Sequence, residues 1–234
     1  MTAESSPIEA VPTVAASIFG PNLEAAGRYA DFLAADGVVR GLIGPREPER
    51  LWTRHILNCV ALAELFPVGV RVVDVGSGAG LPGIVLALAR PDLRVDLVEP
   101  LARREQFLLE AVALSGLGDR VRVVRGRAED PAVMAAVGES GWVTARAVAP
   151  LDRLVGWCLP LLESGGHLVA MKGLSAQSEV DQHRRAIAKA RGINVRVVQC
   201  GVGSIDPPVS VVMVERAPKP ISKAAAKRRA KGKS

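Results

Sequence analysis

A glycine-rich stretch that follows an apolar run constrains the fold of this chain more than any other feature. Residues 72–75 are apolar except for one acid, residues 76–83 contain four glycines and a proline, and residues 84–89 are again apolar. This order is typical of a buried strand, a tight turn and a helix. Because glycine permits positive φ and the close approach of a ligand, and because a helix N-terminus offers unpaired N–H groups, we interpret the stretch as a loop that binds a nucleotide-type ligand.

Two ligand families use such a loop. Gly76, Gly78 and Gly80 form G-x-G-x-G, which looks like the adenosylmethionine loop of class I methyltransferases. Gly78, Gly80 and Gly83 form G-x-G-x-x-G, the dinucleotide fingerprint. The strand favours the first interpretation, because Gly76 closes it directly and the dinucleotide pattern counted from there needs glycine where Leu81 stands. A glycine turn with a purely structural role is the remaining alternative.

Residues near the ends of the first three expected strands point to one ligand. Asp74 is placed to organise the glycine turn through its carboxylate. Glu99 ends the second strand and can accept hydrogen bonds from both ribose hydroxyls of an adenosine, although dehydrogenases use such an acid in the same way and a solvated acid is the alternative. Ala128 and Glu129 follow the third strand, where backbone and a carboxylate can meet the adenine edge.

Length and composition fit one α/β domain with an extension. The chain has 234 residues, 49% of them hydrophobic and only 3% aromatic, as suits the Val, Leu and Ala core of a parallel sheet. It shows neither a signal peptide nor an apolar run of about 18 residues, so we expect a cytoplasmic protein with no membrane partner. The cysteines 59, 158 and 200 lack C-x-x-C spacing, which indicates reduced core thiols and no metal site.

Basic charge is concentrated at the end of the chain. The net charge is +6, but residues 217–234 hold seven Lys and Arg and no acid, which leaves 23 basic residues against 24 acidic ones elsewhere. The body is therefore close to neutral. We expect a tail that is disordered alone and suited to phosphate-backbone contact, with a merely solubilising tail as the alternative.

The remaining pattern predicts a Rossmann-like, doubly wound α/β core. Residues 1–68 are expected to form a helical extension with helices near 18–39 and 48–65, residues 69–216 the core, and residues 217–234 the tail. Repeated strand–helix units imply a mostly parallel seven-stranded sheet with helices on both faces, and the last two strands suggest an antiparallel hairpin at one edge, the plan of class I methyltransferases. The expected strands are 70–75, 94–99, 121–124, 142–147, 167–172, 194–199 and 209–215, and the core helices are 81–89, 101–115, 131–137, 151–162 and 175–191.

Two cations follow the fourth and fifth strands. Arg146 and Lys172 each come at the end of an apolar run, so each should project into the mouth of the site. Two cations beside an adenosine pocket suit a phosphate or an electron-rich base. The alternative is that either one only pairs with Glu99, Glu129 or Asp74.

One set of motifs comes in the order seen in a known family: residues 74–83, the Arg54-His55 helix, Arg103-Arg104 before Phe107-Leu108, Ala145-Arg146-Ala147 and Lys172-Gly173. Together they resemble the RsmG/GidB family of bacterial enzymes. These enzymes methylate guanine N7 at nucleotide 527 of 16S ribosomal RNA, in the decoding-centre loop. The resemblance covers roughly residues 17–215, and two features depart from it: Asn58 stands where many members have Asp, and the basic tail is not a general family feature.

The resemblance implies an S-adenosylmethionine site and an RNA-facing site. Arg146 and Lys172 are the expected catalytic residues, in contact with guanine O6 or a flanking phosphate. The expected RNA-facing residues are Arg54, His55, Arg103, Arg104 and Lys172. Cofactor contacts are expected at Asp74, Gly76, Gly78, Gly80, Leu81, Glu99, Pro100, Leu101, Ala128, Glu129 and Arg146.

The chemistry of guanine N7 agrees with these residue types. N7 carries a lone pair and no proton, so methyl transfer needs alignment of the reacting atoms and no general base. We expect a monomer whose partner is 16S rRNA or the small ribosomal subunit. A small-molecule methyltransferase, a nicotinamide oxidoreductase and a non-catalytic RNA-binding module are the alternatives.

Overall fold

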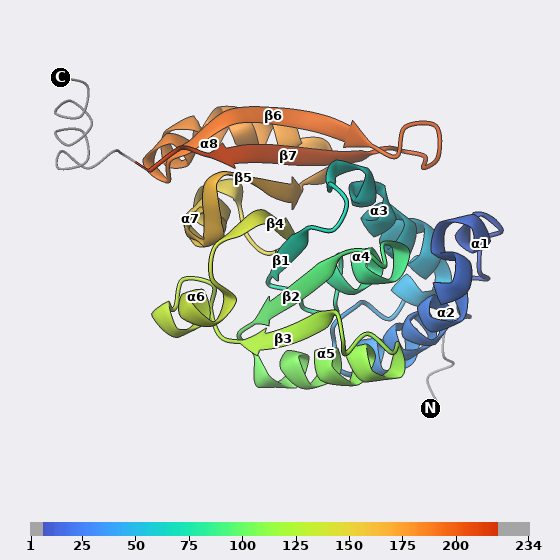
Figure 1. Ribbon diagram of the computed structural model, residues 1–234. Helices are drawn as coiled ribbons and strands as arrows, with labels where there is room; N and C mark the ends of the chain where they lie inside the picture. Colours follow the sequence, from blue (N-terminus) through green and yellow to red (C-terminus); the bar gives the residue numbers. More distant parts are fainter. Residues whose placement is uncertain (1–6, 220–234) are drawn as a thin grey trace, which may run out of the picture.

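One seven-stranded sheet organises the chain. The computed structural model describes residues 7–219, and the strand order is β3-β2-β1-β4-β5-β7-β6. The first five strands are mutually parallel, whereas β7 runs antiparallel to both β5 and β6 (Figure 1). The predicted fold class is thereby confirmed. The strands are β1 (Arg71–Val75), β2 (Arg94–Glu99), β3 (Val121–Arg125), β4 (Ser140–Arg146), β5 (Leu162–Met171), β6 (Gly192–Cys200) and β7 (Val209–Arg216).

Helices cover both faces of this sheet with two separate cores. On one face α4 and α5 pack against β1, β2 and β3, and on the other α6, α7 and α8 pack against β3, β5, β6 and β7. Because the strand order reverses between β1 and β4, the carboxyl ends of these strands border a crevice of the kind in which α/β proteins bind ligands. The helices are α4 (Gly83–Ala89), α5 (Ala102–Leu114), α6 (Pro131–Val137), α7 (Leu151–Cys158) and α8 (Ala176–Lys189).

The segment before β1 is helical, but its two predicted helices are less regular than expected. The first is divided by a 3₁₀ turn at Gly20–Asn22, where Gly20 has a φ of +49° and Pro21 has no N–H to donate. The second alternates 3₁₀, π and α turns. In order, the turns and helices are α1 (Val14–Phe19), η1 (Gly20–Asn22), α2 (Leu23–Phe32), η2 (Leu33–Gly37), η3 (Glu47–Arg50), η4 (Leu51–Ile56), α3 (Leu57–Val60) and η5 (Ala61–Leu65).

The N-terminal helices share the core of the α4 and α5 layer. Tyr29 and Trp52 belong to the same buried cluster as Ile84 and Phe107. Figure 1 shows these helices in blue beside α4 and α5, whereas β6, β7 and α8 form the orange edge of the molecule. The extension therefore packs as part of the domain, close to the start of the glycine loop.

Prolines account for two boundary differences within the core. The helix predicted for 81–89 begins only at Gly83, after Pro82, and the helix predicted for 151–162 ends at Cys158. A 3₁₀ turn, η6 (Leu159–Leu161), follows because Pro160 cannot donate the next helical hydrogen bond. The fifth strand begins already at Leu162, and another 3₁₀ turn, η7 (Gly173–Ser175), leads from β5 into α8.

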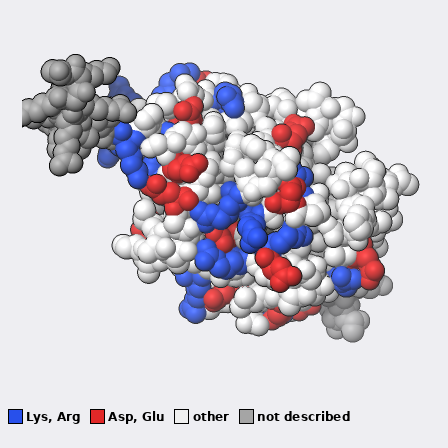
Figure 2. Space-filling view, in the orientation of Figure 1, with Lys and Arg blue, Asp and Glu red and all other residues white. Residues whose placement is uncertain are grey.

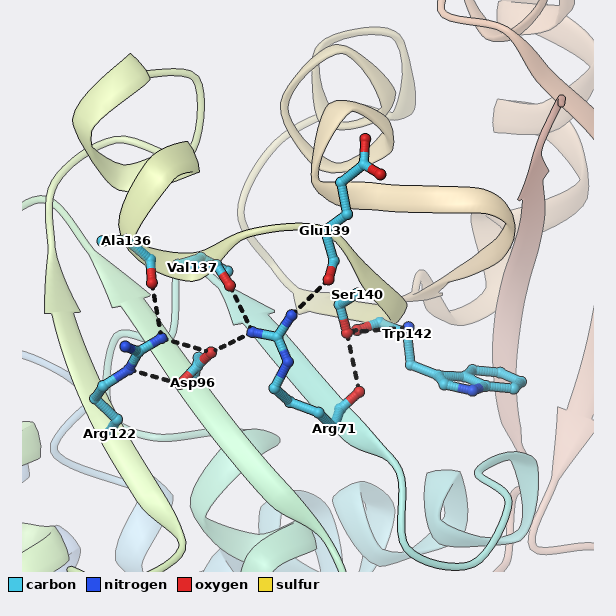
Figure 3. A network of polar contacts seen from close by, with 8 residues as sticks. All are labelled: Arg71, Asp96, Arg122, Ala136, Val137, Glu139, Ser140 and Trp142. Carbon is cyan, nitrogen blue, oxygen red and sulfur yellow. Dashed lines mark hydrogen bonds and ion pairs between the residues drawn. The ribbon is translucent and has the colours of Figure 1, made fainter. Parts of the chain in front are cut away.

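Charged side chains hold the amino ends of the first strands together. On the face drawn in Figure 2, basic and acidic side chains lie next to one another near the centre. Asp96 is buried, with its carboxylate 2.8 Å from Arg71 Nη1 and 2.9 Å from Arg122 Nε, so it joins β1, β2 and β3 (Figure 3). Arg71 also donates to the carbonyls of Val137 and Glu139, which fixes the entry into β4. These arginines are therefore structural partners of an acid.

Three further expectations concern the cysteines, the membrane and the tail. All three cysteines are buried and unpaired, as expected of core thiols. Within residues 7–219 no helix has the length and apolar character needed to cross a membrane. Of the basic tail, only residues 217–219 are described, so the prediction of its disorder and RNA contact lies outside the described residues.

Candidate functional site

Glycine at position 76 permits the sharp bend at the end of β1. Its φ is +68°, and its N–H donates to the carbonyl of Val98 at 2.8 Å, which joins the bend to β2. A Cβ built there would lie 2.8 Å from the Val148 side chain, closer than packed atoms approach. Both the backbone conformation and the lack of space therefore require glycine.

Asp74 organises the turn from below. Its Oδ2 accepts a hydrogen bond of 3.1 Å from the N–H of Gly83, at the start of α4, while Oδ1 has no partner among the described residues. Burial raises the pKa of this carboxyl to about 7, against the hydrogen bonds from Gly83 and Ser77 that lower it. A Cβ at Gly83 would lie 2.7 Å from Asp74 Oδ2, so helix and strand pack closely because that residue is glycine. The predicted role of Asp74 in the turn is confirmed.

A tyrosine that the sequence analysis did not select supports the same loop. The hydroxyl of Tyr29, on α2, donates a hydrogen bond of 2.8 Å to the carbonyl of Ala79. The side chain is fully buried, and burial raises the pKa of the hydroxyl well above its ordinary value. The sequence signal that could have selected Tyr29 is that it is the single tyrosine of the chain and lies on the apolar face of a predicted helix.

Glu99 lies where the ligand is expected. The residue is buried, with 1% of its surface exposed. Its Oε2 accepts a hydrogen bond of 3.0 Å from the N–H of Gly78, and its Oε1 accepts one of 3.1 Å from the N–H of Leu101. Arg104 Nη1 is 4.0 Å from Oε2. Each carboxylate oxygen has two lone pairs, so the group keeps the capacity to accept further hydrogen bonds from a ligand.

A cavity of about 420 Å³ opens above Glu99. Six of the residues predicted to contact the cofactor line it, together with Arg104, Val148 and Trp157, which were not among the predicted cofactor contacts. The lining is mostly apolar beside one buried carboxylate, which suits an adenosine. The six predicted residues are Gly76, Glu99, Pro100, Leu101, Ala128 and Glu129.

A second cavity of about 280 Å³ lies between the glycine loop and the N-terminal extension. Gly78, Leu81 and Arg146 line it, as do Glu47 and His55 of the extension. The other two residues of the cofactor prediction, Asp74 and Gly80, line neither this cavity nor the one above Glu99. Both lie within the turn that shapes the walls.

Arg146 points from the end of β4 toward the extension. Its Nη2 lies 2.5 Å from His55 Nδ1, and its Nη1 lies 3.3 Å from the carbonyl of His55 and 3.0 Å from Cys59 Sγ. It forms no ion pair with an acid in the part of the chain that the structure describes. The alternative in which this arginine pairs with Glu99, Glu129 or Asp74 is therefore wrong.

Lys172 follows β5 and is 9% exposed at its side chain. Its Nζ donates to the carbonyl of Ala149 at 2.6 Å and lies 2.8 Å from Glu179 Oε2. This lysine does have an acidic partner, but it is Glu179 on α8 and none of the three acids considered from the sequence. One of its three N–H donors has no partner among the described residues.

Ala147 lies where three cavities meet. It lines the two described above and a third of about 980 Å³, which Arg146 and Lys172 also border. Its φ of +53° is unusual for a residue other than glycine. The two predicted catalytic cations therefore border the same cavity, next to the expected methyl-donor site.

The residues predicted to face RNA occupy different environments. Arg54 and Arg103 are exposed, and Arg54 Nε lies 3.5 Å from Glu47 Oε2. His55 is buried with both ring nitrogens engaged, and Arg104 lines the cofactor-side cavities. Arg54 and Arg103 are thus the exposed ones among these four, while Lys172, the fifth residue predicted to face RNA, borders the cavity of about 980 Å³.

Comparisons with known proteins find a matching family model and similar chains. A family model described as GidB, rRNA small subunit methyltransferase G, matches residues 22–206. A Salinispora arenicola (strain CNS-205) protein named Ribosomal RNA small subunit methyltransferase G is 56% identical over 218 residues, which cover 90% of each chain. A protein of the same name from Mycobacterium sp. (strain JLS) is 53% identical over 208 residues, covering 89% of this chain and 92% of that protein.

Solved structures of low sequence identity share the fold. Cofactor-bound Rv0187 from MTB has a TM-score of 0.58 at 18% identity and covers 88% of this chain and 95% of that one. The mitomycin 7-O-methyltransferase MmcR has a TM-score of 0.58 at 16% identity and covers 81% of this chain and 60% of that one. The architecture is thus the Rossmann-like fold of class I methyltransferases.

Proposed function

This chain belongs to the GidB family, rRNA small subunit methyltransferase G, and on that premise we propose that it methylates N7 of guanine 527 in 16S ribosomal RNA. The methyl donor is S-adenosylmethionine, and the acceptor lies in the decoding-centre loop. The partner is 16S rRNA, naked or within the small ribosomal subunit. The enzyme acts as a monomer in the cytoplasm.

The observation that carries the cofactor assignment is the buried carboxylate of Glu99 below a largely apolar cavity. Glu99 would hold the ribose hydroxyls, and Ala128 and Glu129 would meet the adenine edge. Gly76 and Leu101 would lie against the remainder of the cofactor. When bound, S-adenosylmethionine supplies an electrophilic methyl group on a positively charged sulfur.

The cavity of about 980 Å³ supports an RNA base as the acceptor. It shares Ala147 and Val148 with the cavity above Glu99, so a base held there would lie next to the cofactor. Arg146 and Lys172 border it and offer N–H donors to acceptors such as guanine O6 or a phosphate oxygen. The guanine must leave its stack to enter, which favours a loop or a flipped nucleotide as the substrate.

Arg146 and Lys172 would serve to position the acceptor base. Guanine N7 has no proton to remove, so alignment of the reacting atoms at about 3–3.5 Å provides most of the acceleration. As N7 gains its bond to carbon, positive charge develops on the ring. Donors at O6 act by holding the base in one orientation.

Two substitutions test this assignment with small subunits from cells that lack the protein. Arg146→Ala and Lys172→Ala should each lower transfer of labelled methyl groups by about 100-fold or more. Titration calorimetry should still find S-adenosylmethionine binding in Lys172→Ala. The control, Arg184→Ala, removes an exposed arginine of α8 that pairs with Asp181, and it should retain full activity. Full activity in both site variants, or transfer only to a panel of metabolites, would refute the proposal.

A further inference from the structure

A chain of polar groups, with His55 buried and Glu47 and Arg146 half-buried, links the N-terminal extension to the end of β4. Arg146 Nη2 lies 2.5 Å from His55 Nδ1, and His55 Nε2 lies 2.5 Å from Glu47 Oε2. The His55 and Glu47 side chains are 11% and 18% exposed. All three residues line the cavity of about 280 Å³ beside the glycine loop, so the chain forms part of the site wall.

The partners determine which protons His55 carries. A guanidinium can only donate hydrogen bonds, so Nδ1 must be the unprotonated acceptor of the bond from Arg146. Nε2 then carries the hydrogen and donates it to the carboxylate of Glu47. The neutral ring satisfies both contacts, whereas the doubly protonated ring would turn an N–H toward the N–H groups of Arg146.

The electrostatic surroundings favour that neutral form. Burial and the neighbouring charge of Arg146 lower the pKa of His55, against the opposing effect of Glu47. From the same segment, Arg54 and Arg50 reach Glu47 at 3.5 Å and 2.8 Å. From the other elements, Arg104 lines the same cavity, and Asp74, Cys59 and Tyr29 lie near the guanidinium of Arg146.

The orientation of Arg146 depends on one short segment of the extension. Its three contacts all come from His55 and Cys59, across the π turn η4 and the start of α3. They occupy three of its five N–H donors, which leaves two without a partner among residues 7–219. Arg146 also lines the cavity of about 980 Å³, so the residue borders the place proposed for the acceptor base.

We propose that Glu47 and His55 are positioning residues, which hold the guanidinium of Arg146 in the orientation that methyl transfer requires. Glu47 fixes the ring of His55, and Nδ1 of that ring fixes Arg146. Protonation of His55 removes the acceptor and releases the arginine, so the alignment is lost at acid pH. This inference rests on the proposed function of Arg146 in holding the acceptor guanine.

Two substitutions at His55 separate this role from a packing role. The Asn side chain keeps an oxygen near the position of Nδ1 but cannot titrate, whereas Leu fills space and offers no acceptor. His55→Leu should lower kcat for methylation of small subunits about 100-fold, as expected for a misplaced catalytic group, with little change in the dissociation constant for S-adenosylmethionine. His55→Asn should keep kcat within about tenfold of the native value.

The pH profile gives the second measurement, with kcat followed from about pH 5 to about pH 8.5. The native enzyme should lose activity at acid pH with a midpoint below 6.5, the ordinary pKa of histidine, and His55→Asn should lack that decline. Glu47→Gln should lower kcat less than His55→Leu does. The control is His167→Asn, which changes a histidine stacked on Trp142 and should preserve the native profile.

The outcomes distinguish this inference from the function on which it rests. If the native enzyme methylates another atom or no RNA at all, the proposed function fails. If the native enzyme methylates guanine N7 and His55→Leu matches it in kcat, the positioning role is refuted. An acid decline that persists unchanged in His55→Asn refutes the protonation step as well.

Discussion

The carboxyl of Asp74 should make the stability of the protein depend on pH. It is fully buried, and burial raises its pKa from 3.8 to about 7. Folding then favours the protonated form, so the free energy of unfolding falls as pH rises from 3.8 toward 7 and levels off above it. At about 1.36 kcal/mol for each pH unit, the whole decline amounts to roughly 4 kcal/mol, of which roughly 2.5 kcal/mol falls between about pH 5 and about pH 8.5.

The substitution Asp74→Asn isolates this contribution. Asparagine keeps an oxygen for the N–H of Gly83 but cannot ionise, and its NH₂ group replaces Oδ1, which has no partner among the described residues. The free energy of unfolding of the variant should therefore be lower by about 1–3 kcal/mol at every pH, because of the unpaired buried donor. It should not show the fall with rising pH that is assigned to Asp74.

Urea unfolding followed by tryptophan fluorescence at several pH values measures both effects. The difference between native and variant curves should change by roughly 2.5 kcal/mol between about pH 5 and about pH 8.5. Asp31→Asn, at an exposed acid of α2, should leave the native pH dependence intact. Parallel curves for the native protein and Asp74→Asn would show that Asp74 is ionised with an ordinary pKa, contrary to the reasoning.

Three further substitutions, one of them with a control, test polar contacts and packing of the glycine loop and of the sheet. Tyr29→Phe removes the hydrogen bond to Ala79, so the free energy of unfolding in urea should fall by about 1 kcal/mol and calorimetry should find weaker binding of S-adenosylmethionine. Unchanged affinity for the cofactor would show that this hydrogen bond does not shape the loop. Gly83→Ala should lower the free energy of unfolding by about 1–3 kcal/mol, because there is no space for a Cβ at this position. The control, Gly27→Ala in α2, has nothing near its Cβ and should raise the free energy of unfolding by up to about 1 kcal/mol. Equal effects of the two substitutions would contradict the packing argument. Asp96→Ala should lower the free energy of unfolding by about 2 kcal/mol, since the two arginines that it joins are partly exposed. A loss below about 0.5 kcal/mol would mean that these ion pairs contribute no more than exposed surface pairs do.

Local sequence patterns were sufficient to predict the sheet and to select six residues that line the cavity above Glu99. The valine-rich strands β1, β2 and β7 are buried along most of their length, and Glu99 and the glycines of the loop lie next to their strand ends in sequence as well as in space. Gly80 and Asp74 line neither that cavity nor the one of about 280 Å³, and the turn packs Gly80 against Ile84, so cofactor contacts at these two residues stay a prediction. The irregular turns near Pro21 and Pro160 follow from the missing donor of proline, which apolar spacing does not register.

The contacts that complete the site come from positions far apart in the chain. Tyr29 reaches Ala79 across fifty residues, and Arg146 reaches His55 across ninety-one. Side-chain pairs of this kind depend on how the N-terminal helices pack on α4, which no local pattern encodes. For the same reason, the acids proposed as partners of the two cations were wrong, and Glu47 was missed altogether.

The most direct test of the central claim maps the methylated atom. Purified enzyme and labelled S-adenosylmethionine are incubated with small subunits from cells that lack this protein, and the 16S rRNA is analysed for modified nucleotides. The account predicts one new N7-methylguanine, at nucleotide 527, and none with Arg146→Ala. A methyl group on another base or another atom of guanine, or no transfer from the native enzyme, would contradict it.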